Sequence, residues 1–302
     1  MIRDYYKEDY EAMVDLISRS YISKNRNEIK FMLSNNKDNR RFIVKEQDEK
    51  IISTCNYVVK PVKLDKHSYS TAFLQDFSTL VDYRNRGHMK NIIKIALDEV
   101  SNSCLFSMIQ TNNPKFFEQF GFEKIYNVHH YTLFNKEISL INTDGVSNSI
   151  TAKEMKCLYY DYFKHFDGYI INEEKDFTHI LDMVNDDIYK LYAYYDKNEP
   201  KGYLIVQEKG VNAVVVDMVY LNTLALHKMV SKVLNEYESI KIKVSYAEKL
   251  SKVFNLAIPK KELYMMVRVN HIALVNKLLK SDYKDATQLF RAYNSIKYIS
   301  YI

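Results

Sequence analysis

The first half of the chain alternates between helical and extended patterns of hydrophobic positions. Apolar residues repeat at helical spacing in "KEDYEAMVDLISRSYI", and "NEIKFMLSNN" predicts a second, short helix. The run "RFIVKEQDEKIISTCNYVV" holds two β-rich segments around a polar turn, which predicts a hairpin. Further along come a strand at "TAFLQDFSTLV", a helix from Met89 to Val100, a strand at "CLFSMIQT", a short helix at "NPKFFEQF" and a closing strand at "GFEKIYNVHHYTLF". The predicted order is β-α-α-β-β-β-α-β-α-β.

The second half partly repeats this order after a polar linker at Glu137–Ser149. It predicts two helices, a hairpin at "IYKLYAYYDKNEPKGYLIVQEK", a strand at "NAVVVDMVYL", a helix at "LALHKMVSKVLNEY" and strands at "IKIKV" and "ELYMMVRV". The two halves share their architecture without residue-level identity. We therefore predict two α/β domains of the α+β kind, each with a mixed, mostly antiparallel sheet flanked by helices. The predicted boundaries are 1–136 and 150–269, with a C-terminal helix and tail over 270–302.

Composition narrows the classes of function. A chain of 302 residues with 47% hydrophobic and 27% charged residues is typical of a globular protein with two cores. The net charge of +5 fits an anionic small ligand, and the short basic tracts do not predict nucleic-acid binding. No apolar run reaches membrane-spanning length, and the charged start is unlike a signal peptide. The three scattered cysteines predict reduced thiols and a cytoplasmic location.

The turn between the predicted strand at "TAFLQDFSTLV" and the next helix reads "DYRNRGHM". A helix N-terminus presents unpaired N–H groups and partial positive charge, which suit a phosphate. Gly87 lets the backbone approach an anion closely, while Arg84 and Arg86 match phosphate geometry. The alternative is a glycine turn with two solvated arginines. The corresponding turn of the second half, "VYLNTLAL", has neither arginine nor glycine.

This stretch resembles the acyl-CoA loop of the GNAT N-acetyltransferase superfamily, whose pattern is Arg/Gln-x-x-Gly-x-Gly/Ala. Here the loop reads Arg84-Asn85-Arg86-Gly87-His88-Met89, with Met89 in place of the usual small residue. The later "FFEQFGFEKIY" is similar to the superfamily's closing motif. The resemblance implies two tandem GNAT-like domains, of which only the first carries the cofactor loop.

Within the superfamily, "FSTLVDYRNRGHMKNII" resembles the bacterial enhanced-intracellular-survival (Eis) family, whose loop tolerates larger residues at that place. The segments "HFDGYIINEEKDFTHIL", "EPKGYLIVQEK" and "ELYMMVRVNHIALVNKLL" are similar to that family's second domain and its exit segment. The family also implies a sterol-carrier-like third domain. About 22 residues follow Lys280, so we expect this domain to be missing or reduced to a remnant.

The resemblance implies transfer of an acetyl group from acetyl-CoA to a primary amine of a small molecule or lysine-like acceptor. The implied cofactor contacts are Phe77, Ser78, Thr79, Arg84, Asn85, Arg86, Gly87, His88, Met89, Asn112 and Asn113. Two of these have alternatives. Asn112 is equally compatible with a helix N-cap ahead of Pro114, and His88 with a solvated loop histidine.

The match to the family's catalytic groups is weaker. Its general acid is a tyrosine four residues before the glycine of the closing motif, where this chain has Phe117. Tyr126, on the closing strand, is an alternative donor, although a tyrosine there is more often part of the core. The family's base is a chain-end carboxylate, and nothing in the sequence places that of Ile302 near the cofactor. The catalytic residues are thus left unassigned.

Two functions from different classes remain. The first is an acetyl-CoA-dependent N-acetyltransferase acting on a small amine, and it is the one we favour. The second is a degenerate acyl-CoA-binding regulatory or interaction protein that kept the loop and lost the chemistry. We expect no metal, because the adjacent His129 and His130 point to opposite faces of a strand. The sequence leaves a homo-oligomer open.

Overall fold

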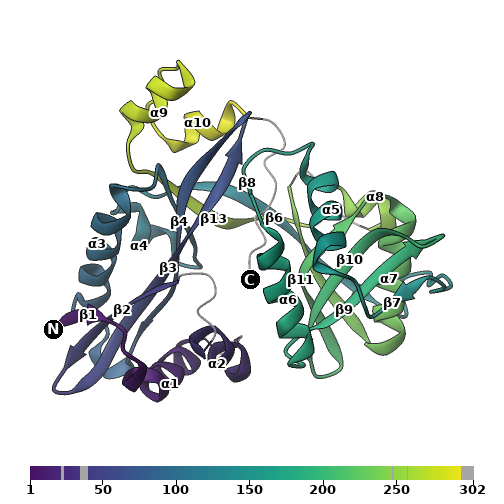
Figure 1. The fold of residues 1–302 in the computed structure, drawn as a ribbon, viewed down its shortest axis with the longest axis horizontal. Helices are drawn as coiled ribbons and strands as arrows, with labels where there is room; N and C mark the ends of the chain where they lie inside the picture. Colours follow the sequence, from purple (N-terminus) through teal and green to yellow (C-terminus); the bar gives the residue numbers. More distant parts are fainter. Residues whose placement is uncertain (22–23, 35–39, 247, 257, 294–302) are drawn as a thin grey trace. The chain divides into compact units, whose positions relative to one another are not determined.

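The computed structural model describes residues 1–21, 24–34, 40–246, 248–256 and 258–293. The chain folds into two compact units (Figure 1). The first comprises Met1–Ile125 and Met265–Ala292, and the second comprises Tyr126–Tyr264 together with Tyr293. Residues 294–302, including Ile302 and its carboxylate, lie outside the described residues. The units do not coincide residue for residue with the predicted domains, whose boundaries stay predictions.

The first unit follows the predicted order of elements. Its elements along the chain are β1 (Ile2–Asp4), α1 (Tyr10–Ser20), α2 (Arg26–Ser34), β2 (Arg41–Gln47), β3 (Lys50–Leu64), β4 (His67–Thr79), α3 (His88–Ser101), β5 (Phe106–Gln110) and α4 (Pro114–Glu118). Strand β6 (Glu123–Phe134) begins in this unit and continues into the second. Short 3-10 turns lie at Lys7–Asp9 and Val81–Tyr83. The prediction of an α/β fold with this element order is confirmed.

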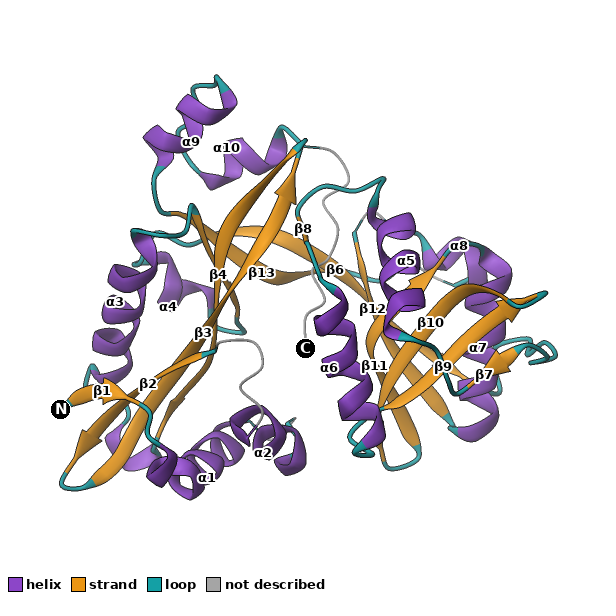
Figure 2. Cartoon of the chain, in the orientation of Figure 1, coloured by secondary structure: helices purple, strands orange, loops and turns teal. Residues whose placement is uncertain are grey.

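The sheet of the first unit has the strand order β1-β2-β3-β4-β5-β13, and Figure 2 shows its helices flanking the strands. Strands β1 to β4 pair antiparallel, and β4 pairs parallel with β5. Helices α1 and α2 are amphipathic, and their apolar faces pack on the inner residues of β2 and β3. That cluster contains Met13, Val14, Leu16, Ile17, Ile29, Leu33, Phe42, Val44 and Ile51. Burial of this face is what holds the two helices on the sheet.

Strand β13 (Lys261–Val269) supplies the last strand of that sheet from a distant part of the chain. Its residues Met265–Val269 pair antiparallel with Gln110–Phe106 of β5. Two short helices follow, α9 (Ile272–Leu279) and α10 (Ala286–Arg291). The pattern predicted "ELYMMVRV" as a strand of the second half, and the structure places its pairing in the first unit. Strand pairing over this separation leaves no local signature in the sequence.

The second unit repeats the architecture. Its elements are β6, β7 (Val146–Ser147), α5 (Ala152–Phe163), β8 (Tyr169–Ile170), α6 (Glu174–Asn185), β9 (Lys190–Asp196), β10 (Glu199–Lys209), β11 (Asn212–Tyr220), α7 (Thr223–Glu236), β12 (Ser239–Ser245) and α8 (Leu250–Phe254). The sheet order is β6-β12-β11-β10-β9-β7. Strand β7, which pairs with β9, lies inside the predicted linker. Its two residues are too short to give a pattern.

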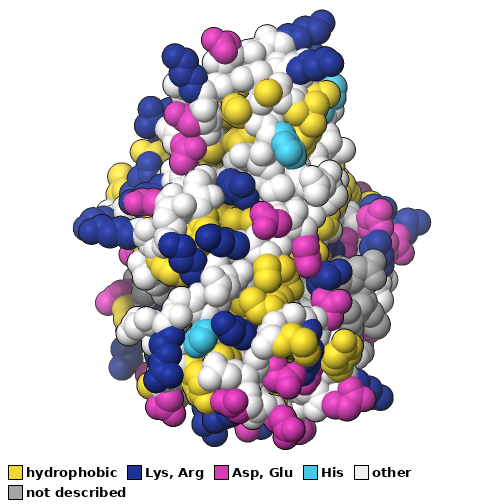
Figure 3. All heavy atoms as spheres, turned by 90° about the vertical axis from the view of Figure 1, so that its left-hand side faces the viewer, with side chains coloured by type: hydrophobic (Ala, Val, Ile, Leu, Met, Phe, Trp, Pro, Cys, Tyr) yellow, Lys and Arg dark blue, Asp and Glu magenta, His cyan; other side chains and the backbone are white. Residues whose placement is uncertain are grey.

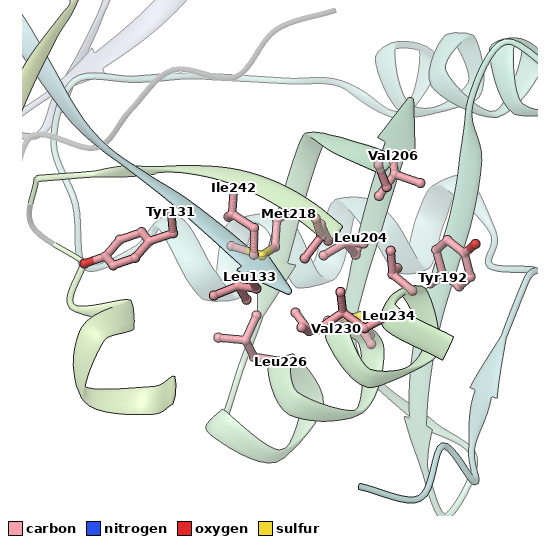
Figure 4. Packing of buried hydrophobic residues seen from close by; sticks show 14 of the residues in the cluster. Tyr131, Leu133, Tyr192, Leu204, Val206, Met218, Leu226, Val230, Leu234 and Ile242 are labelled. Atoms are coloured by element: carbon pink, nitrogen blue, oxygen red, sulfur yellow. The ribbon is translucent and has the colours of Figure 1, made fainter. Parts of the chain in front are cut away.

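The core of the second unit forms between helix α7 and the sheet (Figure 4). Leu226, Val230 and Leu234 of α7 recur at helical spacing and are at most 1% exposed. They pack against Leu133, Leu204, Val206 and Ile242, which come from β6, β10 and β12. This packing matches the predicted period of "LALHKMVSKVLNEY".

Candidate functional site

The parallel ladder between β4 and β5 ends before β4 does. The paired residues run from Thr71 with Phe106 to Leu74 with Ile109. Strand β4 then continues to Thr79, beyond its last pair with β5. The end of β4, which carries the predicted contacts Phe77, Ser78 and Thr79, is therefore not committed to β5. An extended ligand could use its backbone groups in the place of a neighbouring strand.

A β-bulge lies in β4 at the same place. The pairing of β3 with β4 steps from Thr54–Ser78 to Asn56–Gln75, so that Asp76 and Phe77 together face Cys55. Asp76 adopts a left-handed φ of 51°. A bulge bends its strand and re-aims the side chains next to it, and bulges are frequent beside active sites. This one lies between the ladder with β5 and the last residues of β4.

The bulge is held by a buried polar network. The Asp76 carboxylate accepts hydrogen bonds from Lys24 Nζ at 2.5 Å and Asn56 Nδ2 at 2.7 Å. Arg40 Nη1 donates to Asn56 Oδ1 and Gln75 Oε1, both at 3.3 Å. Burial by itself raises the pKa of Asp76, but Lys24, Arg40 and Asn56 lower it by more, so the carboxyl group stays ionised. The net result is an ionised carboxylate at the bulge, paired with the Lys24 ammonium.

The predicted phosphate loop has the conformation that an anion site needs. Gly87 is the N-cap residue of α3 with a left-handed φ of 80°, and no side chain caps the helix. A Cβ added at Gly87 would meet no heavy atom of the described residues within 4 Å. Asn85 is also left-handed, with a φ of 62°. The first N–H groups of α3 therefore have no side-chain cap, and they lie at the end of the helix that carries a partial positive charge.

Basic groups surround this helix start. Arg84 Nε donates to the carbonyl oxygen of Thr79 at 3.1 Å, which ties the loop to the end of β4. The Arg86 guanidinium lies 5.6 Å and the Lys50 ammonium 6.0 Å from the centre of the Tyr83 ring. Sequence reasoning missed Lys50, the first residue of β3, and Tyr83, which precedes Arg84 in the same turn. Figure 3 shows one face of the molecule, on which Lys and Arg side chains are spread with Asp and Glu among them.

His88, the first residue of α3, is half-buried rather than solvated. Its Nδ1 and Nε2 atoms are both enclosed and have no hydrogen-bond partner among the described residues. Burial, followed by the charges of Lys45 and Arg86, lowers the pKa of His88. The ring is therefore neutral at neutral pH and would gain from a nearby anion. Met89, the next residue, is also half-buried.

Asn112 and Asn113 lie between β5 and α4, and both are exposed. The N-cap position of α4 belongs to Asn113, not Asn112, and its side chain makes no capping hydrogen bond. The alternative that Asn112 caps the helix is therefore wrong. The N–H of Asn113 instead donates to Thr111 Oγ1 at 3.0 Å. Whether either amide contacts a cofactor stays a prediction.

Phe117 lies in a cluster of aromatic rings. Its ring centroid is 5.0 Å from that of Phe77 and from that of Phe116, and 6.1 Å from that of Phe122. The residue predicted in the general-acid position thus packs directly on the end of β4. It offers a flat apolar surface there and no proton.

Tyr126, the alternative donor, is committed elsewhere. It is buried, and its hydroxyl donates to the carbonyl oxygen of Gly168 at 3.0 Å, within the second unit. Burial, with the charge of Asp167, raises the pKa of Tyr126 far above the usual value. The geometry gives Tyr126 a structural hydrogen bond, and a catalytic role for it stays a prediction.

One tyrosine near the bulge escaped sequence reasoning. Tyr21 follows α1 and read as part of the apolar stripe of that helix. Its hydroxyl donates to the carbonyl oxygen of Phe77 at 3.2 Å. Only the fold brings the end of α1 to the bulge of β4, so no signal in the sequence could have identified this pair.

The equivalent turn of the second unit is built differently. Asn222 is the N-cap of α7, and its Oδ1 accepts from the N–H of Ala225 at 2.8 Å. The amide oxygen of Asn222 thus caps the N-terminus of α7, whereas no side chain caps the N-terminus of α3 at Gly87. Among the described residues, no three His, Cys, Asp or Glu side chains gather as metal ligands. No helix in the described part of the chain is long and apolar enough to cross a membrane.

The fold of this chain is similar to the folds of several solved structures. A probable N-acyltransferase from Enterococcus faecalis superposes with a TM-score of 0.69 at 18% identity, covering 89% of this chain and 72% of the other. Eis1 from Mycobacterium abscessus gives 0.65 at 12% identity, with 94% and 77% covered. A tandem GNAT protein from the clavulanic acid biosynthesis pathway gives 0.62 at 11% identity, with 90% and 98% covered. At these identities the likeness establishes the fold alone.

The comparison of sequences with known proteins gives a match to the first part of the chain only. No curated protein matches the chain. Residues 1–125, which contain the β4 bulge and the Gly87 loop, match the acetyltransferase (GNAT) domain family. The expectation of an acetyltransferase domain is thereby confirmed, and this chain carries a GNAT acetyltransferase domain over residues 1–125 within the fold of tandem GNAT proteins.

Proposed function

We propose that the protein is an acetyl-CoA-dependent N-acetyltransferase that acylates a primary amine of a small molecule or lysine-like acceptor. The observation that carries this proposal is the pairing of two features in one unit. An uncapped, left-handed Gly87 opens the start of α3, and a bulged end of β4 lies beyond its last pair with β5. The first would hold the pyrophosphate of CoA, and the second would take its pantetheine arm and thioester.

The chain's own groups define what each part would do. The N–H groups at the start of α3, with Arg84 and Arg86, would neutralise the phosphates. The backbone at the end of β4 would align the arm, and the Phe77 and Phe117 rings would form an apolar wall beside it. The amine nitrogen then attacks the thioester carbonyl carbon, the C–S bond breaks, and CoA leaves as the thiol.

We propose further that the protein is Eis-like and works in the cytoplasm. The fold shared with Eis1 supports the first statement. Cys55, Cys104 and Cys157 are all unpaired, which fits a reducing compartment and supports the second. A small-molecule amine is the expected partner, with neither a nucleic acid nor a membrane surface.

One observation favours a second candidate function, that of an acyl-CoA-binding regulatory protein. Phe117 gives the general-acid position no proton, and Tyr126 is hydrogen-bonded to Gly168. An acyl-CoA-binding regulatory protein would need the Gly87 loop and no proton donor. We favour the enzyme, because loss of a general acid typically costs about 10²- to 10⁴-fold and leaves the effect of proximity in place.

The deciding experiment measures binding and turnover separately. Calorimetry with acetyl-CoA tests the site, and release of free CoA over a panel of polyamines, aminoglycosides and lysine derivatives tests the chemistry. Binding with amine-dependent CoA release supports the enzyme. Binding without release over the uncatalysed background leaves the regulatory protein, and absence of binding contradicts both.

A further inference from the structure

We propose that Tyr21 is the proton donor of this site, delivering its hydroxyl proton to the sulfur of CoA as the thioester breaks. This inference rests on the proposed function. The resemblance places the proton donor at Phe117, which has no proton to give, and we assign this role to Tyr21 at the end of helix α1.

The position of the Tyr21 hydroxyl is the first argument. It lies 3.2 Å from the carbonyl oxygen of Phe77, within the bulge of β4. Phe77 is also the residue whose ring packs against Phe117 at 5.0 Å. Phe77 therefore contacts both Phe117, where the resemblance places a donor, and Tyr21, which carries a hydroxyl.

The surroundings of Tyr21 are the second argument. The Lys24 ammonium lies 5.7 Å from the centre of the Tyr21 ring, and it is fixed there by its ion pair with Asp76. Burial, with the charge of Asp76, raises the pKa of Tyr21 well above the usual value. The phenol therefore stays protonated over the whole neutral range. It is available as a hydrogen-bond donor whenever the thiolate forms.

The step balances without a co-reactant. The amine nitrogen forms a bond to the carbonyl carbon, and the electron pair of the C–S bond goes to sulfur. The O–H of Tyr21 turns from the Phe77 carbonyl oxygen to the sulfur and gives up its proton. The lone pair of the phenol oxygen accepts the proton that the new amide nitrogen loses, so no tyrosinate accumulates.

Other hydroxyl groups at the end of β4 are less suited to this role. Ser53 Oγ donates to the carbonyl oxygen of Ser78 at 2.9 Å and also contacts Thr79 Oγ1 at 2.7 Å. Ser78 Oγ is buried without a partner among the described residues, but an aliphatic hydroxyl is a weaker acid than a phenol.

The test removes the hydroxyl at Tyr21 and adds one at Phe117, first separately and then together. Tyr21→Phe keeps the ring and removes the donor, and we expect a drop in kcat of about 100-fold or more with unchanged acetyl-CoA affinity. Phe117→Tyr in that background should recover about 10-fold or more, because it supplies a donor on the other side of Phe77. Phe117→Tyr alone adds a second donor and serves as the reference against which the double variant is compared.

Tyr126→Phe is the matched control, because it also removes one buried tyrosine hydroxyl. Adding Phe117→Tyr to it should recover no activity. The proposal is overturned if Tyr21→Phe turns over like the wild type, or if Phe117→Tyr fails to rescue Tyr21→Phe while both variants bind acetyl-CoA normally. A wild-type protein without turnover would instead remove the proposed function, and this inference with it.

Discussion

The Lys24 ammonium and the Asp76 carboxylate lie 2.5 Å apart beside the bulge of β4, and the Asp76 side chain is only 2% exposed. Burial raises the pKa of Asp76, but Lys24, Arg40 and Asn56 lower it by more. The pKa of Asp76 in the folded state is therefore below its usual value. The folded state therefore gains stability from this carboxylate above about pH 4, the pKa expected in the unfolded chain. That gain is lost as the pH falls through the lower, folded-state pKa.

We predict that Asp76→Asn lowers the free energy of unfolding at pH 7 by up to about 3 kcal/mol, since breaking a buried ion pair is destabilising and Lys24 keeps some access to water. The same variant should flatten the acid limb of the stability curve. Denaturant unfolding between pH 3 and 7 measures both. Asp161→Asn, in an exposed pair with Lys164 at 3.1 Å, is the control and should leave the curve unchanged. Parallel curves for wild type and Asp76→Asn would contradict the assignment.

Much of this fold could be predicted from local patterns. The stripe of Met13, Val14 and Ile17 on α1 is buried, as helical spacing predicts. The hairpin of β2 and β3 and the glycine turn before α3 also lie where the pattern placed them. These features depend on residues close together in the chain, where side-chain period and backbone preference act directly.

The rest depends on contacts between distant segments. The pairing of Met265–Val269 with β5 joins residues more than a hundred positions apart, and no period in either segment identifies the partner. The bulge at Asp76 arises from a register shift against β3. Tyr21 read as core because the pattern reports burial and not the direction of a hydroxyl. The hydrogen bond between Tyr21 and Phe77 at the end of β4 could therefore not be predicted from the sequence.

The next prediction concerns the phosphate loop. Gly87→Val should weaken acetyl-CoA binding at least 10-fold, because its side chain would occupy the open space that a pyrophosphate must enter. The left-handed φ of 80° also strains any other residue, by about 1–2 kcal/mol. Gly210→Val separates these effects, since Gly210 has a φ of 64° and equally open surroundings in the turn between β10 and β11. Both variants should lose stability, and only Gly87→Val should lose affinity in calorimetry. Equal affinities would show that the loop does not bind CoA.

We predict one acetyl-CoA per chain. The start of α7 is closed by the Asn222 side chain, and its turn lacks the arginines and glycine of the first unit. A calorimetric titration should therefore reach a stoichiometry of one, and Asn222→Gly should not create a second site, because no cation replaces Arg84 or Arg86. Two equivalent sites in the wild type would contradict this comparison of the two turns.

The last prediction couples acetyl-CoA binding to the protonation of His88. In the free protein, burial and then Lys45 and Arg86 hold the pKa of His88 below its usual value near 6.5, so the ring is neutral at pH 7.5. A bound phosphate favours the charged ring and raises that pKa. Binding should then take up a proton, and affinity should rise as the pH falls between the bound and free pKa values. Each unit of pKa difference corresponds to about 10-fold in affinity.

The phosphate monoester of CoA titrates near pH 6 and acts in the opposite sense, since its protonation removes negative charge. The effect of His88 is therefore measured as a ratio. Acetyl-CoA affinity is determined at pH 7.5 and pH 6 for the wild type and for His88→Asn, a neutral residue that keeps a polar group at the helix start. The wild type should gain affinity relative to His88→Asn as the pH falls. A pH-independent ratio would mean that His88 does not meet the phosphates, and the enclosed ring nitrogens would then need another partner.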